Sequence, residues 1–203
     1  PPRSTLFPYT TLFRSMALRH RSYFAMAVDF ADINRDGHDD FFVADMMSPT
    51  HLLEMTQIMI TNPLAKPIDE LIDRPIIHRN TLLVNRGDNS YMDTANFSGV
   101  AATEWTWGAT FLDVNLDGLE VLLIANGHAF DTQDLDAIER IARLGKLPAA
   151  QARKKVFLYP PLTVPNMVFR NDGGLRFTEA GSQWGFESKN ISHGISQIGR
   201  AHV

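Results

Sequence analysis

The sequence contains no cysteine, no long apolar run and no strong net charge. Without cysteine, a disulfide framework and a thiolate metal site are both excluded. No apolar run approaches the roughly 18 residues that a membrane-spanning helix needs. The net charge of −4 comes without a basic patch that could hold nucleic acid. The 203 residues, 44% of them hydrophobic, are typical of a globular protein or of a piece of one.

Both ends of the chain read as sequence foreign to the protein. Residues 1–15 resemble the conceptual translation of a common sequencing adapter, and residues 198–203 resemble that of its partner adapter. We therefore expect non-native tails on either side of residues 16–197. We interpret residues 16–197 as an internal fragment of a longer protein, so a signal peptide would lie outside it.

An acidic loop that begins at Asp32 is the most informative motif. Its candidate ligands alternate around Gly37, and they are Asp32, Asn34, Asp36, the backbone carbonyl of His38, and Asp40. Alternating oxygen ligands around a glycine turn suit a hard cation of the size of calcium. Two of these carboxylates at ~5 Å repel each other by about 3 kcal/mol, and a divalent cation removes that cost. The alternative is an Asp/Asn/Gly turn without metal.

A second acidic loop begins 81 residues later, with Asp113 in the place of Asp32. Its candidate calcium ligands are Asp113, Asn115, Asp117 and the carbonyl oxygen of Leu119. Val121 stands where the first loop has its last carboxylate, and on a regular strand the neighbouring Glu120 would point to the opposite side. Calcium and a simple turn therefore both remain open for this loop.

Neither loop has the pattern of an EF-hand. Position 12 of the first loop is Val43 instead of glutamate, and the apolar run that follows is typical of a strand. Calcium modules outside the cell have dissociation constants on the order of 0.1–1 mM. Such an affinity suits a stabilising ion, whereas a catalytic metal would need an open position and nearby bases.

A second type of motif alternates with the acidic loops. Residues 80–93 and 166–179, 86 positions apart, each read as a strand, a glycine turn and a short second strand, which predicts hairpins. The segments around the loops, 24–44 and 107–125, are copies of each other, and a further copy is indicated from Ser192. Joined in order, the two types give about four short strands per unit, as in the blades of a β-propeller.

On these residues the chain resembles the FG-GAP/VCBS repeats of bacterial relatives of cartilage acidic protein, the ASPIC/UnbV-associated type. The resemblance covers residues 22–47, 78–127 and 166–197. It implies an all-β fold with short helical insertions, a partial β-propeller of four-stranded blades, and calcium in the blade loops. It also implies an exported protein that is extracellular, periplasmic or attached to the cell surface.

The expected division of the propeller fragment follows from this resemblance. It is a half blade at 16–47, a full blade at 78–127 and a half blade at 166–197. Insertions at 48–77 and 128–165 separate the blades. One or two short helices are expected in the first insertion. In the second, helical spacing of apolar residues predicts a helix over 134–144 with Asp134 as its N-cap.

This interpretation favours a non-enzymatic binding or adhesion module with a protein or carbohydrate ligand and with further blades in the same parent chain. One alternative is the scaffold of a propeller-containing enzyme whose catalytic residues lie elsewhere. Another is an intracellular calcium sensor, which the weak expected affinity and the missing glutamate disfavour. The sequence shows no serine elbow, phosphate loop or zinc-binding HExxH motif.

Several further residues have a plain structural interpretation. Arg86, Gly87 and Asp88 spell an integrin-binding tripeptide, but they fall where the hairpin needs its turn. His128 is expected to be a hydrogen-bonded structural residue instead of an acid or base. Three tryptophans could stack on a sugar, although core or interblade packing is expected for them: Trp105, Trp107 and Trp184.

Overall fold

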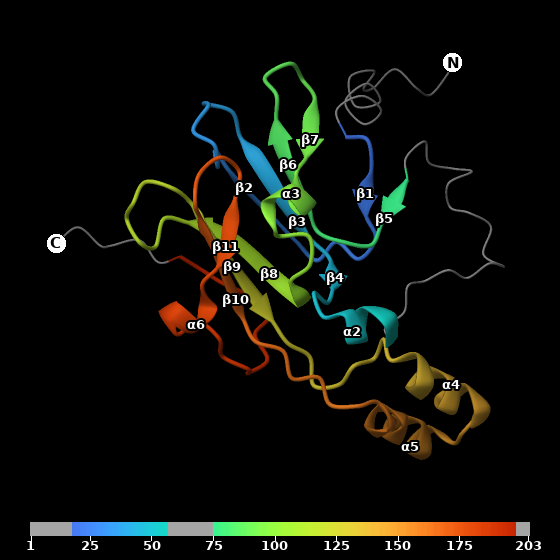
Figure 1. Ribbon diagram of the computed structural model, residues 1–203. Coiled ribbons are helices and arrows are strands. Elements are labelled where there is room, and N and C mark those ends of the chain that lie inside the picture. The colour runs from blue at the N-terminus through green and yellow to red at the C-terminus, as the bar shows by residue number, and fades with distance from the viewer. Residues whose placement is uncertain (1–17, 57–74, 198–203) are drawn as a thin grey trace, which may run out of the picture.

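Two antiparallel sheets form most of the protein in the computed structural model, which describes residues 18–56 and 75–197 (Figure 1). The first sheet contains, in spatial order, β2 (Ala27–Ala31), β3 (Asp40–Ala44), β6 (Thr81–Asn85) and β7 (Tyr91–Asp93). The second contains β8 (Glu104–Leu112), β9 (Val121–Asn126), β10 (Met167–Asn171) and β11 (Phe177–Glu179). The short β4 (Met46–Met47) pairs with the free edge of β8. A separate parallel pair joins β1 (Arg21–Ser22) to β5 (Ile76–Ile77).

In each sheet, two strands that an insertion separates in the sequence pair with each other, β3 with β6 and β9 with β10. In the first sheet β3 pairs with β6, so that Phe41 lies opposite Leu83. The sequence grouped residues 78–127 as one blade, but β6 and β7 share their sheet with β2 and β3, while β8 and β9 belong to the next sheet. The grouping differs because pairing follows cross-strand packing, which joins strands that an insertion separates in the sequence.

The two sheets repeat each other in detail. A four-residue helix follows each hairpin, α3 (Ala95–Ser98) in the first unit and α6 (Gly181–Trp184) in the second. Each helix ends at a glycine with positive φ, Gly99 at 80° and Gly185 at 67°. Glycine suits this position because a side chain is strained there. The repeat inferred from the sequence is therefore also a repeat of local structure.

Helices are few and short, and apart from α3 and α6 they lie in the insertions, so the predicted all-β fold with short helical insertions is confirmed. In the first insertion α2 spans His51–Thr56, and the rest of that prediction falls outside the described residues. In the second, α4 spans Leu135–Arg143, and the Asp134 side chain caps it by accepting the Ala137 N–H at 2.7 Å. Among residues 18–56 and 75–197, no helix has the length and apolarity to cross a membrane.

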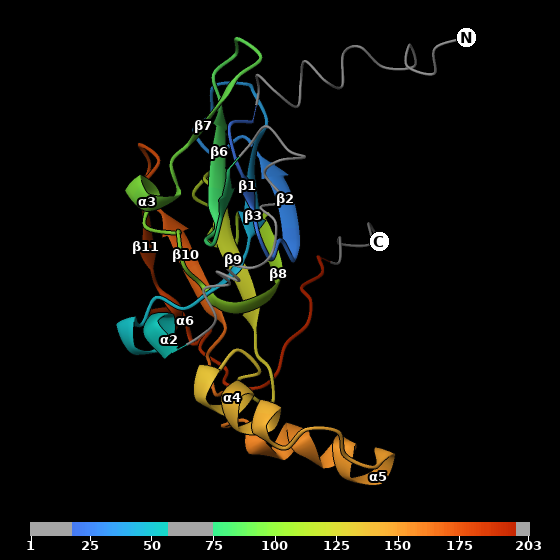
Figure 2. The same cartoon turned by 90° about the vertical axis from the view of Figure 1, so that its right-hand side faces the viewer.

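Helix α4 belongs to a helical hairpin instead of lying flat on a sheet. Its partners are α5 (Ala149–Ala152) and the 3₁₀ segment η3 (Arg153–Leu158). The hairpin projects from the end of the second sheet in two perpendicular views (Figures 1 and 2). Of the α4 residues only Ala137 is buried, and Leu135 remains 47% exposed. The predicted helix is therefore confirmed, but its apolar stripe is only partly covered.

The core lies between the two sheets, which pack face to face. Its main cluster joins one face of the first sheet to one face of the second; the members include Phe42, Leu82 and Val84 from the first sheet and Phe111, Leu122 and Ile124 from the second. The rings of Phe42 and Phe111 meet edge to face with centroids 6.4 Å apart. A polar link runs beside them, because Asp29 on β2 accepts the backbone N–H of Phe111 at 2.7 Å. Strands β2 and β8, which belong to different sheets, are thus fixed to each other.

Candidate metal-binding loops

The first acidic loop connects β2 to β3, as the sequence predicts. The carboxylate of Asp32 accepts the backbone N–H groups of Asp36 at 3.0 Å and Gly37 at 2.9 Å. The chain can curl around this carboxylate because φ is positive at Arg35 (62°) and Gly37 (86°). Glycine adopts such an angle without strain, whereas Arg35 does so at a small energetic cost.

The remaining side chains of the first loop lie on this curl. The Asn34 amide donates to Asp36 at 2.8 Å, and the His38 N–H donates to the other oxygen of Asp36 at 2.9 Å. These two hydrogen bonds, the one from Asn34 first, hold the pKa of Asp36 below its usual value. The loop therefore keeps Asp36 ionised at the exposed end of the first sheet.

The second loop, between β8 and β9, reproduces this pattern. Asp113 accepts the N–H groups of Asp117 at 3.1 Å and Gly118 at 3.0 Å. The Asn115 amide donates to Asp117 at 2.6 Å, and the Leu119 N–H donates to Asp117 at 2.8 Å. The same hydrogen bonds thus form in both loops, although only the first has a carboxylate at its last ligand position.

Asp40, the last predicted ligand of the first loop, has a structural role in the fold. It is fully buried, and its two oxygens accept the backbone N–H groups of Ile33 at 3.2 Å and Asn85 at 2.8 Å. Burial raises the pKa of Asp40 to about 6, and the charges of Asp36 and Asp32 add to the shift. Asp40 therefore ties the loop to β6, and its remaining lone pairs leave it able to accept a further partner.

The position-9 residue of the second loop does not supply a ligand. Val121 is buried in the core at 1% exposure. Glu120 instead faces the first loop, where it lies 3.1 Å from the guanidinium of Arg35, and Arg35 also donates to the carbonyl oxygen of Gly118. The two acidic loops are therefore neighbours in space, joined by an arginine that the sequence reasoning overlooked.

The donor set of the first loop fits a hard cation. Its groups are oxygens only: the carboxylates of Asp32 and Asp36, the Asn34 amide and the His38 carbonyl. An ionised carboxylate has about four lone-pair sites, so the hydrogen bonds seen here leave room for a cation. In the described segments no three His, Asp or Glu side chains are already gathered for a metal. Amide and carbonyl oxygens would have to complete such a site.

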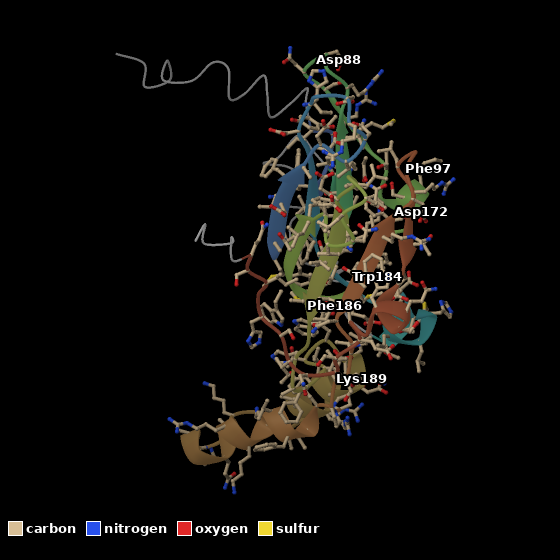
Figure 3. The ribbon with its side chains drawn as sticks, turned by 90° about the vertical axis from the view of Figure 1, so that its left-hand side faces the viewer. Asp88, Phe97, Asp172, Trp184, Phe186 and Lys189 are labelled. Carbon is tan, nitrogen blue, oxygen red and sulfur yellow. The ribbon has the colours of Figure 1, made fainter. Side chains whose placement is uncertain are left out.

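The turn formed by Arg86, Gly87 and Asp88 is confirmed as the tip of the β6–β7 hairpin. Figure 3 shows Asp88 at the end of the molecule opposite the α4–α5 hairpin. Gly87 has φ 71°, and a Cβ there would lie 2.9 Å from the His38 ring. The backbone angle therefore favours glycine, and the exposed His38 ring would have to shift to admit a side chain here.

The remaining residues noted in the sequence, a histidine and three tryptophans, mostly make contacts that stabilise the fold. His128 has its Nδ1 atom 2.6 Å from the Phe130 carbonyl and stacks on Trp105 with ring centroids 4.9 Å apart, so the hydrogen-bonded interpretation is confirmed. Trp105 is buried, and Trp107 donates to the Gly127 carbonyl at 2.7 Å. Trp184, in contrast, is 38% exposed at the end of α6.

Sequence reasoning missed a buried carboxylate at the start of β8. Glu104 is only 8% exposed and has φ 70°, an unusual angle for a residue with a side chain. The Ser48 hydroxyl donates to it at 3.1 Å. Burial, and then the charge of Asp131, raise the pKa of Glu104. No local pattern marks this site, since it depends on contacts between distant segments.

The raised pKa of Glu104 predicts a pH-dependent stability. The folded state favours the protonated carboxyl of Glu104. The stabilisation that this carboxyl contributes is therefore complete below the unfolded pKa of about 4.3, and it is lost as the pH rises through the folded pKa. We expect Glu104→Gln to match the wild type near pH 4 and to exceed its unfolding free energy at pH 7. Urea unfolding at both pH values measures this, with the exposed Glu187→Gln as control. An equal difference at both pH values would contradict the prediction.

Comparison with models of protein families and with curated proteins identified no relative of this chain. The sequence matches no model of a known protein family and no curated protein. The geometry of the loops and sheets therefore carries the functional argument.

Proposed function

We propose that this chain is part of a calcium-stabilised β-propeller that acts as a non-enzymatic binding or adhesion module of an exported protein. The observation that carries the proposal is the recurrence of one acidic loop, with one hydrogen-bond pattern, between the first two strands of each repeating unit, in a four-stranded sheet and in the five-stranded sheet that follows it. Two independent sites with the same oxygen-rich curl favour a shared role in the repeat. A protein or a carbohydrate is the expected ligand, and other blades of the parent chain would supply the rest of the surface.

The way the sheets stack supports a propeller. Phe30 on β2 corresponds to Phe111 on β8, 81 positions later. Phe111 is 8% exposed because it packs on the first sheet, whereas Phe30 is 59% exposed and its neighbour Val28 is 54% exposed. The exposed face of the first sheet is therefore equivalent to the face through which the second sheet packs on the first. A preceding unit, packed as the second packs on the first, would cover it.

The C-terminal segment supports a further unit on the other side. The N–H of Ser192 donates to the carbonyl oxygen of Asn126 at 2.9 Å, and the Asn166 amide donates to the Ser192 hydroxyl at 3.0 Å. A Cβ on Gly108 would lie 3.2 Å from the Cα of Gly194. Residues 192–197 therefore lie beside β8 much as β8 lies beside β2, in keeping with the copy indicated from Ser192.

Calcium would act in this proposal as a brace for the loops. Asp32, Asn34, Asp36 and the His38 carbonyl would hold it in the first loop, with Asp40 behind them. In the second loop Asp113, Asn115, Asp117 and the Leu119 carbonyl would form a weaker site that lacks the last carboxylate. At ten times its dissociation constant, one bound ion stabilises the fold by about 1.4 kcal/mol. Because Arg35 joins the loops, bracing the first loop would also support the second.

We expect calcium to raise the melting temperature of the protein by about 3–6 °C, the shift that ~1.4 kcal/mol gives in a domain of this size. Asp36→Ala is expected to remove most of that shift, because it deletes a central oxygen ligand. Thermal unfolding followed by circular dichroism, with calcium and with chelator, measures the effect.

The matched control is Asp88→Ala. It also removes an exposed carboxylate from a tight turn, where Asp88 accepts the N–H of Ser90 at 3.0 Å, but it lies outside both acidic loops. This variant should keep the full calcium shift. Identical melting curves with calcium and chelator, or equal losses in both variants, would refute the calcium site.

A further inference from the structure

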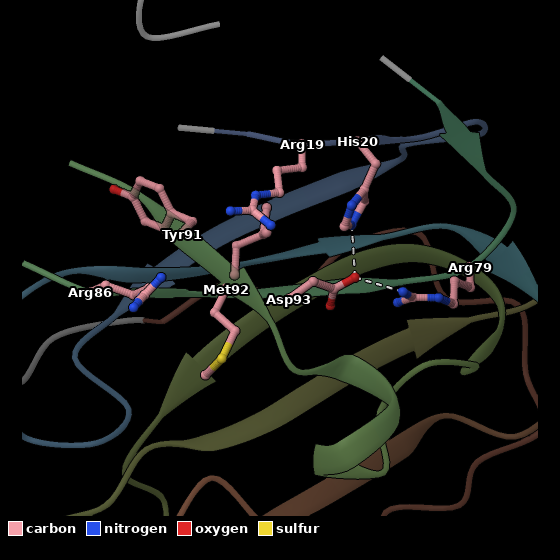
Figure 4. A pocket seen from close by; sticks show the side chains of 8 residues that line it. Arg19, His20, Arg79, Arg86, Tyr91, Met92 and Asp93 are labelled. Atoms are coloured by element: carbon pink, nitrogen blue, oxygen red, sulfur yellow. Dashed lines mark hydrogen bonds and ion pairs between the residues drawn. The ribbon is translucent and has the colours of Figure 1, made fainter. Parts of the chain in front are cut away.

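A cavity of about 420 Å³ lies against β6 and β7 of the first sheet, and none of its lining residues belongs to an acidic loop. Its lining brings together three arginines from distant parts of the chain, Arg19, Arg79 and Arg86, with His20 and Tyr91. Figure 4 shows Arg19, Arg86 and Tyr91 on one side and His20, Asp93 and Arg79 on the other. A cavity of this volume has room for a small organic ligand.

The one carboxylate in this lining is fully engaged. One oxygen of Asp93 lies 2.7 Å from Arg79 and 2.8 Å from His20. Its other oxygen accepts the backbone N–H groups of Leu82 at 3.3 Å and Ala95 at 3.0 Å. Asp93 can therefore balance Arg79, but it has no free oxygen for a further arginine.

Two guanidinium groups are left to face the cavity. Among the described residues neither Arg19 nor Arg86 forms an ion pair within 4.0 Å. The nearby charge of Asp88 acts on the Arg86 guanidinium, but Asp88 is fully exposed at the tip of the turn. Guanidinium groups bind carboxylate, sulfate and phosphate oxygens through paired N–H donors. The lining thus has an excess of positive charge in a protein whose net charge is negative.

The repeat shows that the sheet itself does not require these residues. Positions that serve the fold are kept in the second unit: Asn80, Asn85 and Gly87 recur as Asn166, Asn171 and Gly173. The cavity positions change, because Arg79 becomes Pro165, Arg86 becomes Asp172 and Tyr91 becomes Phe177. The cluster of cations therefore belongs to the first unit alone and calls for an explanation other than blade structure.

A second, smaller cavity continues along the same hairpin. Its volume is about 230 Å³, it shares Tyr91 with the first, and its other lining residues are His38, Asn85, Gly87 and Asn89. Amide and imidazole groups suit hydroxyl groups, and an aromatic ring suits the apolar face of a sugar. A ligand with an anionic end and a hydroxylated body would match the two cavities in turn.

We propose that this surface binds an acidic saccharide, whose carboxylate or sulfate group is held by Arg19 and Arg86 beside Tyr91. The inference deepens the proposed binding function and rests on it for the role of the ligand, but it does not depend on calcium. Arg79 is a positioning residue, since Asp93 and the Asn80 carbonyl hold it in place.

The test is calorimetric titration of the protein with glucuronate, glucose and inorganic sulfate, each with calcium and with chelator. We expect glucuronate to bind with a dissociation constant on the order of 1 mM. Sulfate should compete with it, and glucose should show no binding. The double variant Arg19→Ala/Arg86→Ala should bind glucuronate at least tenfold more weakly. The control Arg140→Ala/Arg143→Ala removes the same charge from exposed positions on α4 and should bind as the wild type does.

Other binding results would overturn the proposal. Equal binding of glucose and glucuronate would remove the role of the anion, and binding of sulfate without glucuronate would leave a site for a free ion only. Equal affinity in both double variants would show a nonspecific charge effect. Binding that persists in chelator supports this site even if the calcium proposal fails. A calcium-dependent melting shift without glucuronate binding would support the calcium site and refute the saccharide site.

Discussion

Asp40→Ala is expected to lower the free energy of unfolding by about 3 kcal/mol, with or without calcium. Asp40 is fully buried, and its oxygens are the acceptors for the N–H groups of Ile33 and Asn85. Leaving a buried donor unsatisfied costs about 1–3 kcal/mol. The Ile33 donor is buried and the Asn85 donor is partly buried, so the second adds to the cost of the first. Asn85 stands at the end of β6, so the same change loosens the pairing that closes the first sheet.

Chemical unfolding in the presence of chelator separates this role from metal binding. Under those conditions Asp36→Ala should change the unfolding free energy by less than about 1 kcal/mol, because Asp36 is exposed. Asp40→Asn is a milder variant that keeps one acceptor oxygen and should fall between the two. If Asp40→Ala and Asp36→Ala were equally stable in chelator, the role of Asp40 in the fold would be refuted.

The local elements of this protein could be predicted from sequence because their signals are local. Positive φ at Gly37 and Gly118 follows from the Asp/Asn/Gly pattern, and Asp134 caps its helix as its position indicates. The hairpins at 80–93 and 166–179 have alternating apolar residues around a glycine turn. In each case the interactions that fix the element lie within a few residues of one another.

The grouping of strands could not be predicted in the same way. The pairing of β3 with β6 depends on contacts such as Phe41 with Leu83 and on the Asp40–Asn85 hydrogen bond, which cross an insertion. Sequence order placed the hairpin at 80–93 with the loop that follows it, whereas packing places it with the loop that precedes it. Asp40 offered a signal, because a position-9 carboxylate at the start of a buried strand needs partners from outside its loop.

The candidate sites also differ in whether their residues are close together in the sequence. The acidic loops are local, so their residues were found, although the link from Arg35 to Glu120 was not. The arginine cavity joins residues near positions 19, 79 and 86, which have no common pattern in the sequence. Only the fold of the first sheet, with the chain before β2 laid against β7, brings them together.

The second large effect is expected at Phe111, the aromatic residue of β8 that packs on the first sheet. Phe111→Ala should lower the unfolding free energy by about 3–5 kcal/mol, the range for a buried phenylalanine whose removal leaves a cavity. Its ring centroid lies 6.4 Å from those of both Phe42 and Phe177. Urea unfolding measures the loss, and Phe111→Leu, with a smaller loss of about 1–1.5 kcal/mol, serves if the alanine variant does not fold.

Phe30 is the matched residue, and it turns this stability measurement into a test of the repeat. In the present chain it is 59% exposed, so Phe30→Ala should change the unfolding free energy by less than about 1 kcal/mol. In a longer chain that includes the preceding repeat, a propeller requires a blade to cover Phe30 as the first sheet covers Phe111. The same substitution should then cost about 3 kcal/mol or more. Phe30→Ala that stays neutral in the longer chain would mean that its exposed face is not an interblade surface, and the propeller would have to be abandoned.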